Sequence, residues 1–467
     1  MTKISFWHRG GRAAVAVVCG GLFLGACNVN QELLQPQQPG VISPEAVVTA
    51  TAADALWTGA LGQWKAAMNG TGNSNRESLW NWEGLFTDEM RSTDTFTQRQ
   101  DADQRNLQTN DGVLTPIYNT AQQARGRARD AIIALKTYDQ SAAGQQHVGE
   151  MYLMMGYIEM EMSQAFCNGI PFGETVDGVP QYTQPLTNAQ GFALAISRID
   201  TALTFLTGTD SGSLNIKWAA LVTKARAQVD LGDFAAAATT VATVPTGFQY
   251  NFTYSQTTVD NEWWIEGHSV KRYSAGDSTD VAGQILNAIP FARLGDPRVV
   301  AVDTHTKAED NTSDFVDVTN WGRDDPIPVL SGIDARLIEA EAQLQAGNIA
   351  GMRAILDTLR TQGQTLGVFV VPPMDTLTTL NTGVNPDTAT SVFFREKALW
   401  QFQRGYRMDD LRRLVRQYGR TQDNVFPSGK FTSLGGPAGN YGTQVAFPVP
   451  DYEKTNPNFH GCLDTNA

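Results

Sequence analysis

Two segments of the chain share one helix-turn-helix plan, and this internal repeat constrains the fold more than any other feature. The segment KARAQVDLGDFAAAATTV at 224–241 aligns without gaps on EAEAQLQAGNIAGMRAIL at 339–356. In each copy a glycine can close the first helix in a left-handed conformation, and the polar residue after it can cap the second helix. These residues are Gly232 with Asp233 in the first copy and Gly347 with Asn348 in the second. The repeat therefore predicts helical hairpins of tetratricopeptide character.

Apolar periodicity predicts two more hairpins. The first pairs residues 117–138 with 145–166, where methionines recur at spacings of three, four and seven and define one apolar face. The second pairs 392–403 with 407–418, with Gly405 at the turn. The expected fold class is mostly α, with about four tetratricopeptide-like helical hairpins.

Long insertions interrupt this helical array. Segments 69–111, 245–325 and 363–390 are rich in Gly, Pro, Thr, Asn and Asp, which predicts loops containing short strands or helices. Binding residues concentrate on loops that a rigid scaffold holds in place. We therefore expect the functional residues to lie in these insertions.

The beginning of the chain has the pattern of an export signal. Basic residues precede a short apolar run at 13–24, and Leu-Gly-Ala then leads into Cys27. This junction resembles the lipobox of bacterial lipoproteins, so residues 1–26 are predicted to be removed and Cys27 to carry lipid. Residues 27–43 would form a polar, extended tether, and 44–467 a single domain with insertions. An ordinary secretory signal with an incidental cysteine is the alternative.

Charge and cysteine content narrow the possible partners. The formal net charge of −13 disfavours binding to nucleic acid and to anionic membrane surfaces. With Cys27 lipidated and the signal removed, Cys167 and Cys462 remain. In an exported protein such a pair predicts a disulfide, with two unrelated thiols as the alternative.

The sequence contains none of the common catalytic motifs. GxSxG, GxxxxGK[ST], HExxH and CxxC are all absent, and the histidines after residue 26 are widely separated. No metal, cofactor or catalytic residue is therefore predicted. Pairs of carboxylates could still serve glycoside hydrolysis, so a lipoprotein hydrolase stays open as an alternative.

Aromatic residues in the insertions suggest a binding surface. Indole rings stack on the apolar faces of sugars, while polar neighbours fix orientation through hydrogen bonds. The candidate ligand-binding residues are Trp80, Trp82, Phe96, Arg99, Asp101, Trp263, Trp264 and Trp321. The alternative is that the tryptophans are anchors buried against the repeats.

Several motifs carry a resemblance to a known family. Most of them lie in the last part of the chain, and one follows the methionine-rich segment. REKALWQFQRGYRMDDLRR at 395–413 resembles the charged pattern of the SusD/RagB family, FPVP at 447–450 and NPN at 456–458 resemble its closing elements, and GIPFGE at 169–174 resembles its turn after a helix. Their order and spacing agree across nearly the whole chain after the signal. In the first motif Tyr406 stands in place of the usual histidine, and Met408 with Asp409 in place of the usual aromatic pair, which puts the ligand class in doubt more than the fold.

The charged residues of the first motif are expected to be structural. Arg407, Arg412 and Arg413 share one amphipathic helix and lie close to Glu396 and Asp410 in the sequence. We expect them to tie hairpins together through ion pairs rather than to bind a ligand.

The resemblance implies a SusD-like, non-enzymatic protein anchored to the outer membrane by lipid. Such a protein would bind a nutrient, an oligosaccharide first and a peptide as the alternative, and act as the lid of a SusC-like TonB-dependent receptor. A tetratricopeptide-type scaffold for protein partners is a second class of function.

Overall fold

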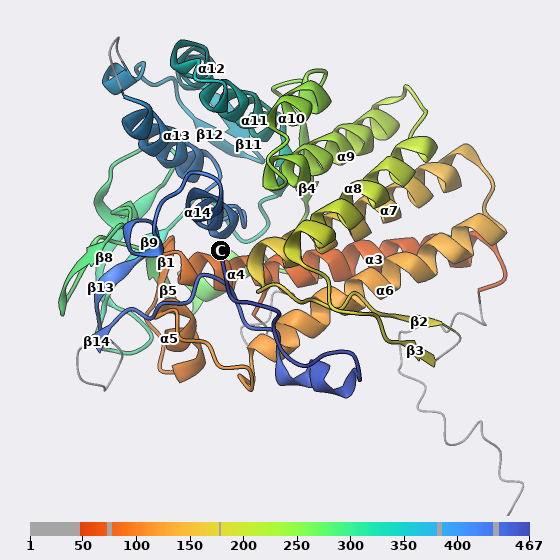
Figure 1. The fold of residues 1–467 in the computed structure, drawn as a ribbon, viewed down its shortest axis with the longest axis horizontal. Helices are drawn as coiled ribbons and strands as arrows, with labels where there is room; N and C mark the ends of the chain where they lie inside the picture. Colours follow the sequence, from red (N-terminus) through yellow and green to blue (C-terminus); the bar gives the residue numbers. More distant parts are fainter. Residues whose placement is uncertain (1–46, 72–76, 177–178, 381–384, 433–438) are drawn as a thin grey trace, which may run out of the picture. The chain divides into compact units, whose positions relative to one another are not determined.

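Helices pack side by side in one continuous row, each on the next in the order α3, α6, α7, α8, α9, α10, α11 and α12 (Figure 1). The computed structural model describes residues 47–71, 77–176, 179–380, 385–432 and 439–467. Val48–Ala467 forms one compact unit. The helices of the row are α3 (Ala50–Asn69), α6 (Leu114–Tyr138), α7 (Ala142–Ala165), α8 (Asn188–Phe205), α9 (Ser211–Asp230), α10 (Phe234–Val241), α11 (Gly332–Gln345) and α12 (Ile349–Thr361). This row is the predicted mostly-α, tetratricopeptide-like fold; the predicted signal peptide, Cys27 and the tether up to residue 43 lie outside the described residues.

The internal repeat forms the hairpins α9–α10 and α11–α12. Gly232 and Gly347 end the first helix of each pair with φ of 84° and 73°, the left-handed conformation that the sequence predicts. The capping prediction is confirmed for Asn348, whose side chain accepts from the backbone N–H of Gly351 at 3.0 Å. It is wrong for Asp233, whose side chain makes no capping hydrogen bond to α10.

Helix α7 is buried on all sides in its second half, whereas the methionine spacing predicts one apolar face. Every residue from 153 to 165 is buried, because α3, α6, α8, α9 and α14 all pack on this helix. Two glutamates in this stretch are therefore paired with arginines. Glu159 binds Arg125 at 2.8 Å and Glu161 binds Arg226 at 2.8 Å.

The sequence analysis overlooked two helices of the row. Helix α3 begins after Thr49, whose hydroxyl accepts from the N–H of Ala52. Helix α8 begins with a capping box in which Thr187 and Gln190 each bond to the other's backbone N–H. The T-x-x-Q spacing was a usable start signal for α8.

The pair predicted from 392–403 and 407–418 exists as helices but not as a hairpin of the row. Helix α13 (Pro386–Trp400) packs mainly on α11 and α12, whereas α14 (Arg407–Arg416) packs mainly on α4 (Leu79–Phe86) and α7. Charged side chains connect the two helices, with Lys397 bonded to Asp410 at 2.6 Å. The partner of each helix is thus set by long-range packing rather than by the short turn between them.

The motif residues of α14 make structural contacts, as expected. Arg413 is fully buried and binds Glu341 of α11, and the guanidinium of Arg412 donates to the carbonyl oxygens of Gln164 and Phe166 at 2.6 and 3.0 Å. These bonds hold α14 against α11 and against the end of α7.

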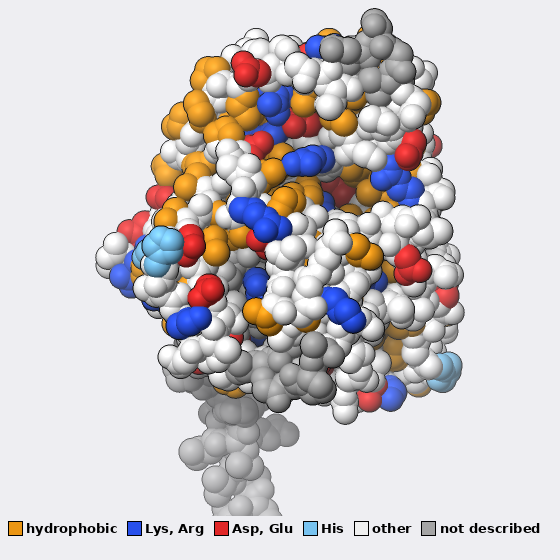
Figure 2. Space-filling view, turned by 90° about the vertical axis from the view of Figure 1, so that its left-hand side faces the viewer, with side chains coloured by type: hydrophobic (Ala, Val, Ile, Leu, Met, Phe, Trp, Pro, Cys, Tyr) orange, Lys and Arg blue, Asp and Glu red, His pale blue; other side chains and the backbone are white. Residues whose placement is uncertain are grey.

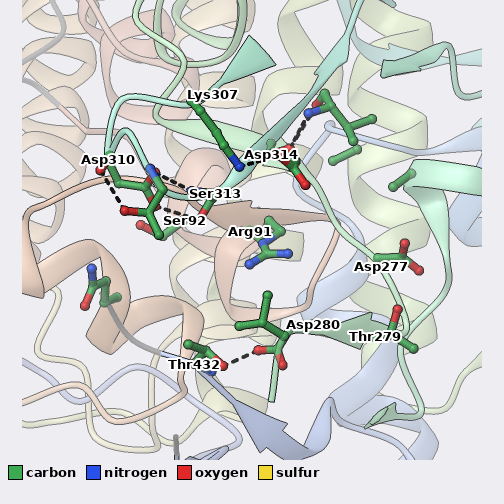
Figure 3. Close-up of a pocket in the computed structure, with 17 residues that line it drawn as sticks. Arg91, Ser92, Asp277, Thr279, Asp280, Lys307, Asp310, Ser313, Asp314 and Thr432 are labelled. Carbon is green, nitrogen blue, oxygen red and sulfur yellow. Dashed lines mark hydrogen bonds and ion pairs between the residues drawn. The ribbon is translucent and has the colours of Figure 1, made fainter. Parts of the chain in front are cut away.

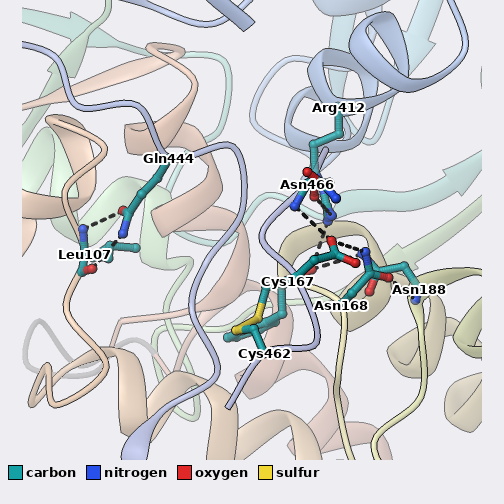
Figure 4. Close-up of a disulfide and its surroundings, with 10 residues drawn as sticks. Leu107, Cys167, Asn168, Asn188, Arg412, Gln444, Cys462 and Asn466 are labelled. Atoms are coloured by element: carbon teal, nitrogen blue, oxygen red, sulfur yellow. Dashed lines mark hydrogen bonds between the residues drawn. A yellow bond between two sulfur atoms is a disulfide. The ribbon is translucent and has the colours of Figure 1, made fainter.

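Cys167 and Cys462 are joined by a disulfide, with their Cα atoms 6.0 Å apart (Figure 4). The bond connects the residue two after α7 to the last residues of the chain. Beside it, Arg412 donates to the carbonyl of Asn466 at 3.2 Å, and Asn168 donates to Asp464 at 2.8 Å.

The insertions carry short antiparallel strands, as the sequence predicts, and further strands lie outside them. The strands are β1 (Met90–Ser92) with β5 (Tyr273–Ala275); β4 (Gln249–Phe252) with β10 (Ile327–Ser331); β8 (Ala301–Lys307) with β9 (Asp314–Val318); β11 (Gln364–Leu366) with β12 (Phe369–Val371); β2 (Glu174–Val176) with β3 (Val179–Gln181); and the sheet β14 (Gly439–Asn440), β13 (Ser428–Phe431), β7 (Gly283–Leu286), β6 (Thr279–Asp280). Pairing of β1 with β5 places the first predicted insertion beside the second. The side of the molecule that carries β8, β9, β13 and β14 shows charged side chains of both signs interspersed (Figure 2).

Candidate functional site

A cavity of about 510 Å³ opens where the first two insertions meet, and we call it the insertion pocket (Figure 3). It is lined by Arg91, Ser92, Gln100, Ser274, Ala275, Asp277, Thr279, Asp280, Val281, Ala292, Lys307, Asp310, Thr312, Ser313, Asp314, Val316 and Thr432. All of these except Thr432 belong to the segments 69–111 and 245–325, in which the sequence predicts the function to lie.

Strand pairing builds the walls of the insertion pocket. Strands β1 and β5 run antiparallel with Arg91 opposite Ser274. The hydroxyl of Ser274 also accepts from the N–H of Val316 at 2.8 Å, which fixes β9 beside β5. The β8–β9 hairpin and helix α5 (Thr97–Asp103) are joined to the same frame, since the N–H of Asp310 donates to the carbonyl of Thr93.

The carboxylates of the insertion pocket are held by donors of the protein itself. Asp314 is paired with Lys307 at 2.6 Å, and hydrogen bonding to this ammonium lowers the pKa of Asp314. Asp277 is paired with Arg293 at 3.0 Å. Asp280 accepts from the N–H groups of Ala282 and Thr432 at 2.6 and 2.9 Å, and Asp310 accepts from those of Thr312 and Ser313, both at 2.8 Å.

A buried charge network supports the pocket. Arg99 binds Glu77 and Asp94, and Arg272 binds Asp94 at 3.2 Å and Glu266 at 3.6 Å. Burial raises the pKa of Glu266 to about 8. Because Arg99 is buried within this network, it orders α5 against the second insertion. Arg99 is not among the residues that line the pocket, and its role as a ligand contact stays a prediction.

Four of the five candidate tryptophans are core residues. Trp80, Trp82, Trp263 and Trp321 are 0, 0, 3 and 4% exposed, so none presents a ring face to a ligand. Helix α4, which carries the first two, is buried along its whole length. The indole N–H of Trp263 donates to the carbonyl of Gln403 at 2.9 Å. The structure corrects the sequence-based prediction at these positions in favour of the alternative, loop anchors buried against the repeats.

The three other candidates differ in how they are placed. Trp264 is partly exposed, but His268 stacks on its ring at 5.7 Å between centroids and Arg323 lies 5.2 Å from the ring centroid. Asp101 is half-buried, burial raises its pKa, and it is not among the lining residues.

Phe96 is the one candidate that is both exposed and next to the insertion pocket. Its side chain is 50% exposed, and its carbonyl accepts from the N–H of Gln100, which lines the pocket. The preceding Thr95 is bonded through its N–H to Glu309, the neighbour of Asp310 in the pocket wall. Phe96 thus lies at the rim.

Sequence reasoning missed the polar residues that line the pocket. It located the insertions but chose their aromatic residues, whereas the lining consists mainly of charged and hydroxyl side chains, together with four small or apolar residues. The run AEDNTSD at 308–314, rich in turn-forming residues, was the available signal for the β8–β9 turn.

The described residues contain neither a cluster of metal ligands nor a membrane-spanning helix. Among the described residues, no group of three or more His, Cys, Asp or Glu side chains could hold a metal ion. In the same part of the chain, no helix has both the length and the apolar character needed to cross a bilayer.

Comparison with known proteins identifies the fold. No family model matches the sequence, and no curated protein matches it either. Solved structures do match, at 11 to 14% sequence identity for the three described next.

A SusD-like carbohydrate-binding protein from Bacteroides vulgatus superposes with a TM-score of 0.61 at 11% identity, covering 88% of this chain and 97% of that one. A SusD-like carbohydrate-binding protein from Bacteroides fragilis gives 0.61 at 12% identity, covering 88% and 99%. A SusD superfamily protein from Bacteroides thetaiotaomicron gives 0.58 at 14% identity, covering 89% and 100%. The chain therefore has the fold of the SusD-like proteins.

Proposed function

We propose that this protein is a SusD-family lipoprotein that binds an oligosaccharide in the insertion pocket and delivers it to a partner TonB-dependent transporter, acting as its lid. The observation that carries the proposal is a polar cavity of about 510 Å³ on the insertions of a SusD-like scaffold. Two of the structural neighbours are themselves described as carbohydrate-binding proteins.

The chemistry of the insertion pocket suits a sugar. Sugar hydroxyls both donate and accept hydrogen bonds, and the pocket offers carboxylate acceptors together with guanidinium, ammonium and hydroxyl donors. A pocket of a few hundred cubic ångströms with several convergent polar groups is typical of a small-molecule site. Phe96 at the rim adds an exposed aromatic face on which a sugar ring can stack.

Anchoring and delivery are supported by the sequence motifs alone. The lipobox-like junction at Cys27 supports a lipid anchor in the outer membrane, and the SusD/RagB motifs support a SusC-like receptor as the partner. Labelled palmitate should be incorporated by the wild-type protein and not by Cys27→Ala. The same variant should leave the membrane fraction, while the wild-type protein should co-purify with the receptor barrel.

Binding can be tested by calorimetry with a panel of oligosaccharides and a panel of peptides. We expect oligosaccharides to bind and Phe96→Ala to weaken that binding about 2- to 10-fold, the range expected for loss of one aromatic stacking contact. Tyr452→Ala, which removes an exposed aromatic outside the pocket, should bind as the wild-type protein does.

Each other result would identify a different function. Binding of peptides alone would move the protein to the peptide-binding alternative, and binding of neither panel would favour a protein-interaction scaffold. Release of shorter sugars from a bound oligosaccharide, followed by chromatography, would make it a hydrolase.

A further inference from the structure

Arg91 differs from the other charged residues of the insertion pocket because its guanidinium has no acceptor among the described residues. It extends from β1 and lies, in the view of Figure 3, between the Lys307–Asp314 pair and Asp280. Among the residues that the structure describes, none accepts a hydrogen bond from Arg91 and no carboxylate lies within 4.0 Å of its nitrogens. A guanidinium has five N–H donors in a fixed planar arrangement, so this one can bind an acceptor that enters the pocket.

Two hydroxyl groups beside the pocket also lack a hydrogen-bond partner among the described residues. The Oγ of Ser92 and the Oγ1 of Thr432 are buried and have no hydrogen-bond partner in the described part of the chain. Both residues line the pocket. Because both oxygens are buried, they lie behind the surface of the cavity, and Arg91 is left as the donor that a ligand can reach.

The acceptors of the pocket, in contrast, already have donors. The carboxylates of Asp314 and Asp277 are in ion pairs, and those of Asp280 and Asp310 each accept two backbone N–H groups. Arg91 is thus the one charged residue of the lining that has no partner in the described part of the chain.

The carboxyl groups behind β1 compensate Arg91 only in part at neutral pH. Burial raises the pKa of Asp103 to about 7, and burial raises the pKa of Asp88 well above its usual range. Asp103 also faces inward, where it accepts the backbone N–H of Ser92 at 2.7 Å. The charge of Arg91 is therefore available to a ligand.

We propose that the insertion pocket selects an acidic sugar, whose carboxylate or sulfate group pairs with Arg91. The inference rests on the proposed function, since it names the class of glycan bound there. Arginine pairs with such planar or tetrahedral anions through two parallel N–H···O bonds, which gives orientation as well as affinity.

The acidic character of the whole chain does not oppose this binding strongly. At physiological salt the field of exposed charges falls off over about 8 Å, so most of the formal charge of −13 acts weakly at the pocket. Of the four aspartates that line the pocket, Asp277 and Asp314 are in ion pairs. A partly enclosed pair with Arg91 is screened much less.

The test compares uronate-containing, sulfated and neutral oligosaccharides by calorimetry, with the full chain lacking only the signal and lipid. We expect the tightest ligand to carry a carboxylate or a sulfate. Comparing the uronate-containing with the sulfated oligosaccharides identifies which of the two anions is bound. For a uronate ligand, reduction of its carboxylate to the alcohol should weaken binding at least tenfold, because the sugar ring is kept and only the charge is lost.

Variants then assign the effect to Arg91. Arg91→Gln should weaken binding of the acidic ligand about 10- to 100-fold, the range of a charge-assisted pair, while Arg91→Lys should keep part of the affinity. Arg420→Gln is the matched control: it makes the same change in charge in a pair with Asp387 outside the pocket, and it should bind within twofold of the wild-type protein.

Failure of the inference is distinguishable from failure of the proposed function. Neutral oligosaccharides that bind as tightly as acidic ones, with Arg91→Gln unchanged, would overturn the acidic class and leave glycan binding standing. Absence of binding by every oligosaccharide would overturn both.

Discussion

Glu341 is fully buried on α11 and binds two cations, Arg413 of α14 and Lys397 of α13. Burial alone would raise its pKa, but the attraction of Arg413 and Lys397 outweighs burial and holds the pKa below its usual value. Removing one partner of a buried ion pair leaves the other charge uncompensated, which costs about 3–5 kcal/mol. We therefore expect Glu341→Ala to lower the free energy of unfolding by about that amount, measured by urea denaturation.

A matched control lies two residues away on the same helix. Glu339 is paired with Arg336 at 3.1 Å, and both side chains are partly exposed. Such pairs contribute about 0–1 kcal/mol, so Glu339→Ala should be nearly neutral. If both variants lose the same free energy of unfolding, the buried pairing of Glu341 with Arg413 and Lys397 does not stabilise the fold more than an exposed pair does.

Glu89 predicts a pH dependence of stability. Burial raises its pKa to about 8, although Arg407 and the backbone N–H of Gln403 act in the opposite direction. A carboxyl group with a raised pKa stabilises the folded state below its unfolded pKa, and this contribution is lost as the pH rises through the folded value. The free energy of unfolding should therefore fall between about pH 5 and pH 8.

The free energy of unfolding of Glu89→Gln should fall less steeply over this range. The slope should be smaller by up to about 1.4 kcal/mol per pH unit, because glutamine has no proton to lose. Urea denaturation at intervals from pH 5 to pH 8.5 measures the two slopes. Asp210→Asn is the control: the hydrogen bond from Ser213 lowers the pKa of Asp210, so its replacement should not change the slope. Parallel curves for Glu89→Gln and the wild-type protein would contradict the assignment of this proton to Glu89.

At the scale of elements, the turn before α14 is restricted both by its backbone conformation and by its neighbours. Gly405 has φ of 73°, and a Cβ atom there would overlap the indole of Trp80 on α4. Gly347 has the same φ of 73°, but nothing lies within 4 Å of the Cβ position. Alanine variants at these two glycines therefore separate the cost of backbone strain from the cost of steric overlap.

Gly347→Ala should cost about 1–2 kcal/mol, the penalty of a left-handed conformation for an L-residue. Gly405→Ala should cost about 2–5 kcal/mol, because overpacking adds about 1–3 kcal/mol to the same strain. Thermal and urea denaturation of both variants give the comparison. A loss at Gly405 no larger than that at Gly347 would mean that Trp80 moves aside without cost.

The elements also separate what the sequence could predict from what it could not. The helices around Gly232 and Gly347 were predictable because apolar periodicity and a glycine stop are local signals. The pairing of 392–403 with 407–418 was wrong as a hairpin because α14 packs mainly on α4 and α7, and nothing in the local sequence encodes that choice. Helix α7 was predicted to have one apolar face and one exposed face, because it carries Glu159 and Glu161. These glutamates can be buried since arginines of other helices pair with them, and the local sequence does not reveal those pairs.

At the scale of the whole molecule, the sequence located the candidate site but not its residues. The insertions were recognisable by composition, whereas the pocket exists only because β1 pairs with β5 and the hydroxyl of Ser274 binds β9. The tryptophans were selected for their affinity for sugars, yet four of them fill the space between insertions and helices. Whether a large aromatic side chain in a loop faces inward depends on contacts between distant segments, which a single sequence does not reveal.

The disulfide between Cys167 and Cys462 closes a segment of 295 residues that contains most of the helical row. In the chain-entropy view, a crosslink over so long a segment stabilises the protein mainly by restricting the unfolded chain. We expect the double variant Cys167→Ser with Cys462→Ser to lose about 2–5 kcal/mol in urea denaturation, and the wild-type protein to lose a similar amount under reducing conditions.

The fold around the disulfide should survive this loss. The backbone N–H of Cys167 donates to Phe447 at 2.9 Å, and Arg412 holds the carbonyl of Asn466, so the end of the chain is bound by hydrogen bonds as well. The double variant should therefore keep the circular dichroism of the wild-type protein at low urea and be insensitive to reductant. If reduction leaves the unfolding free energy of the wild-type protein unchanged, these hydrogen bonds alone hold the end of the chain, and the crosslink does not contribute measurably to stability.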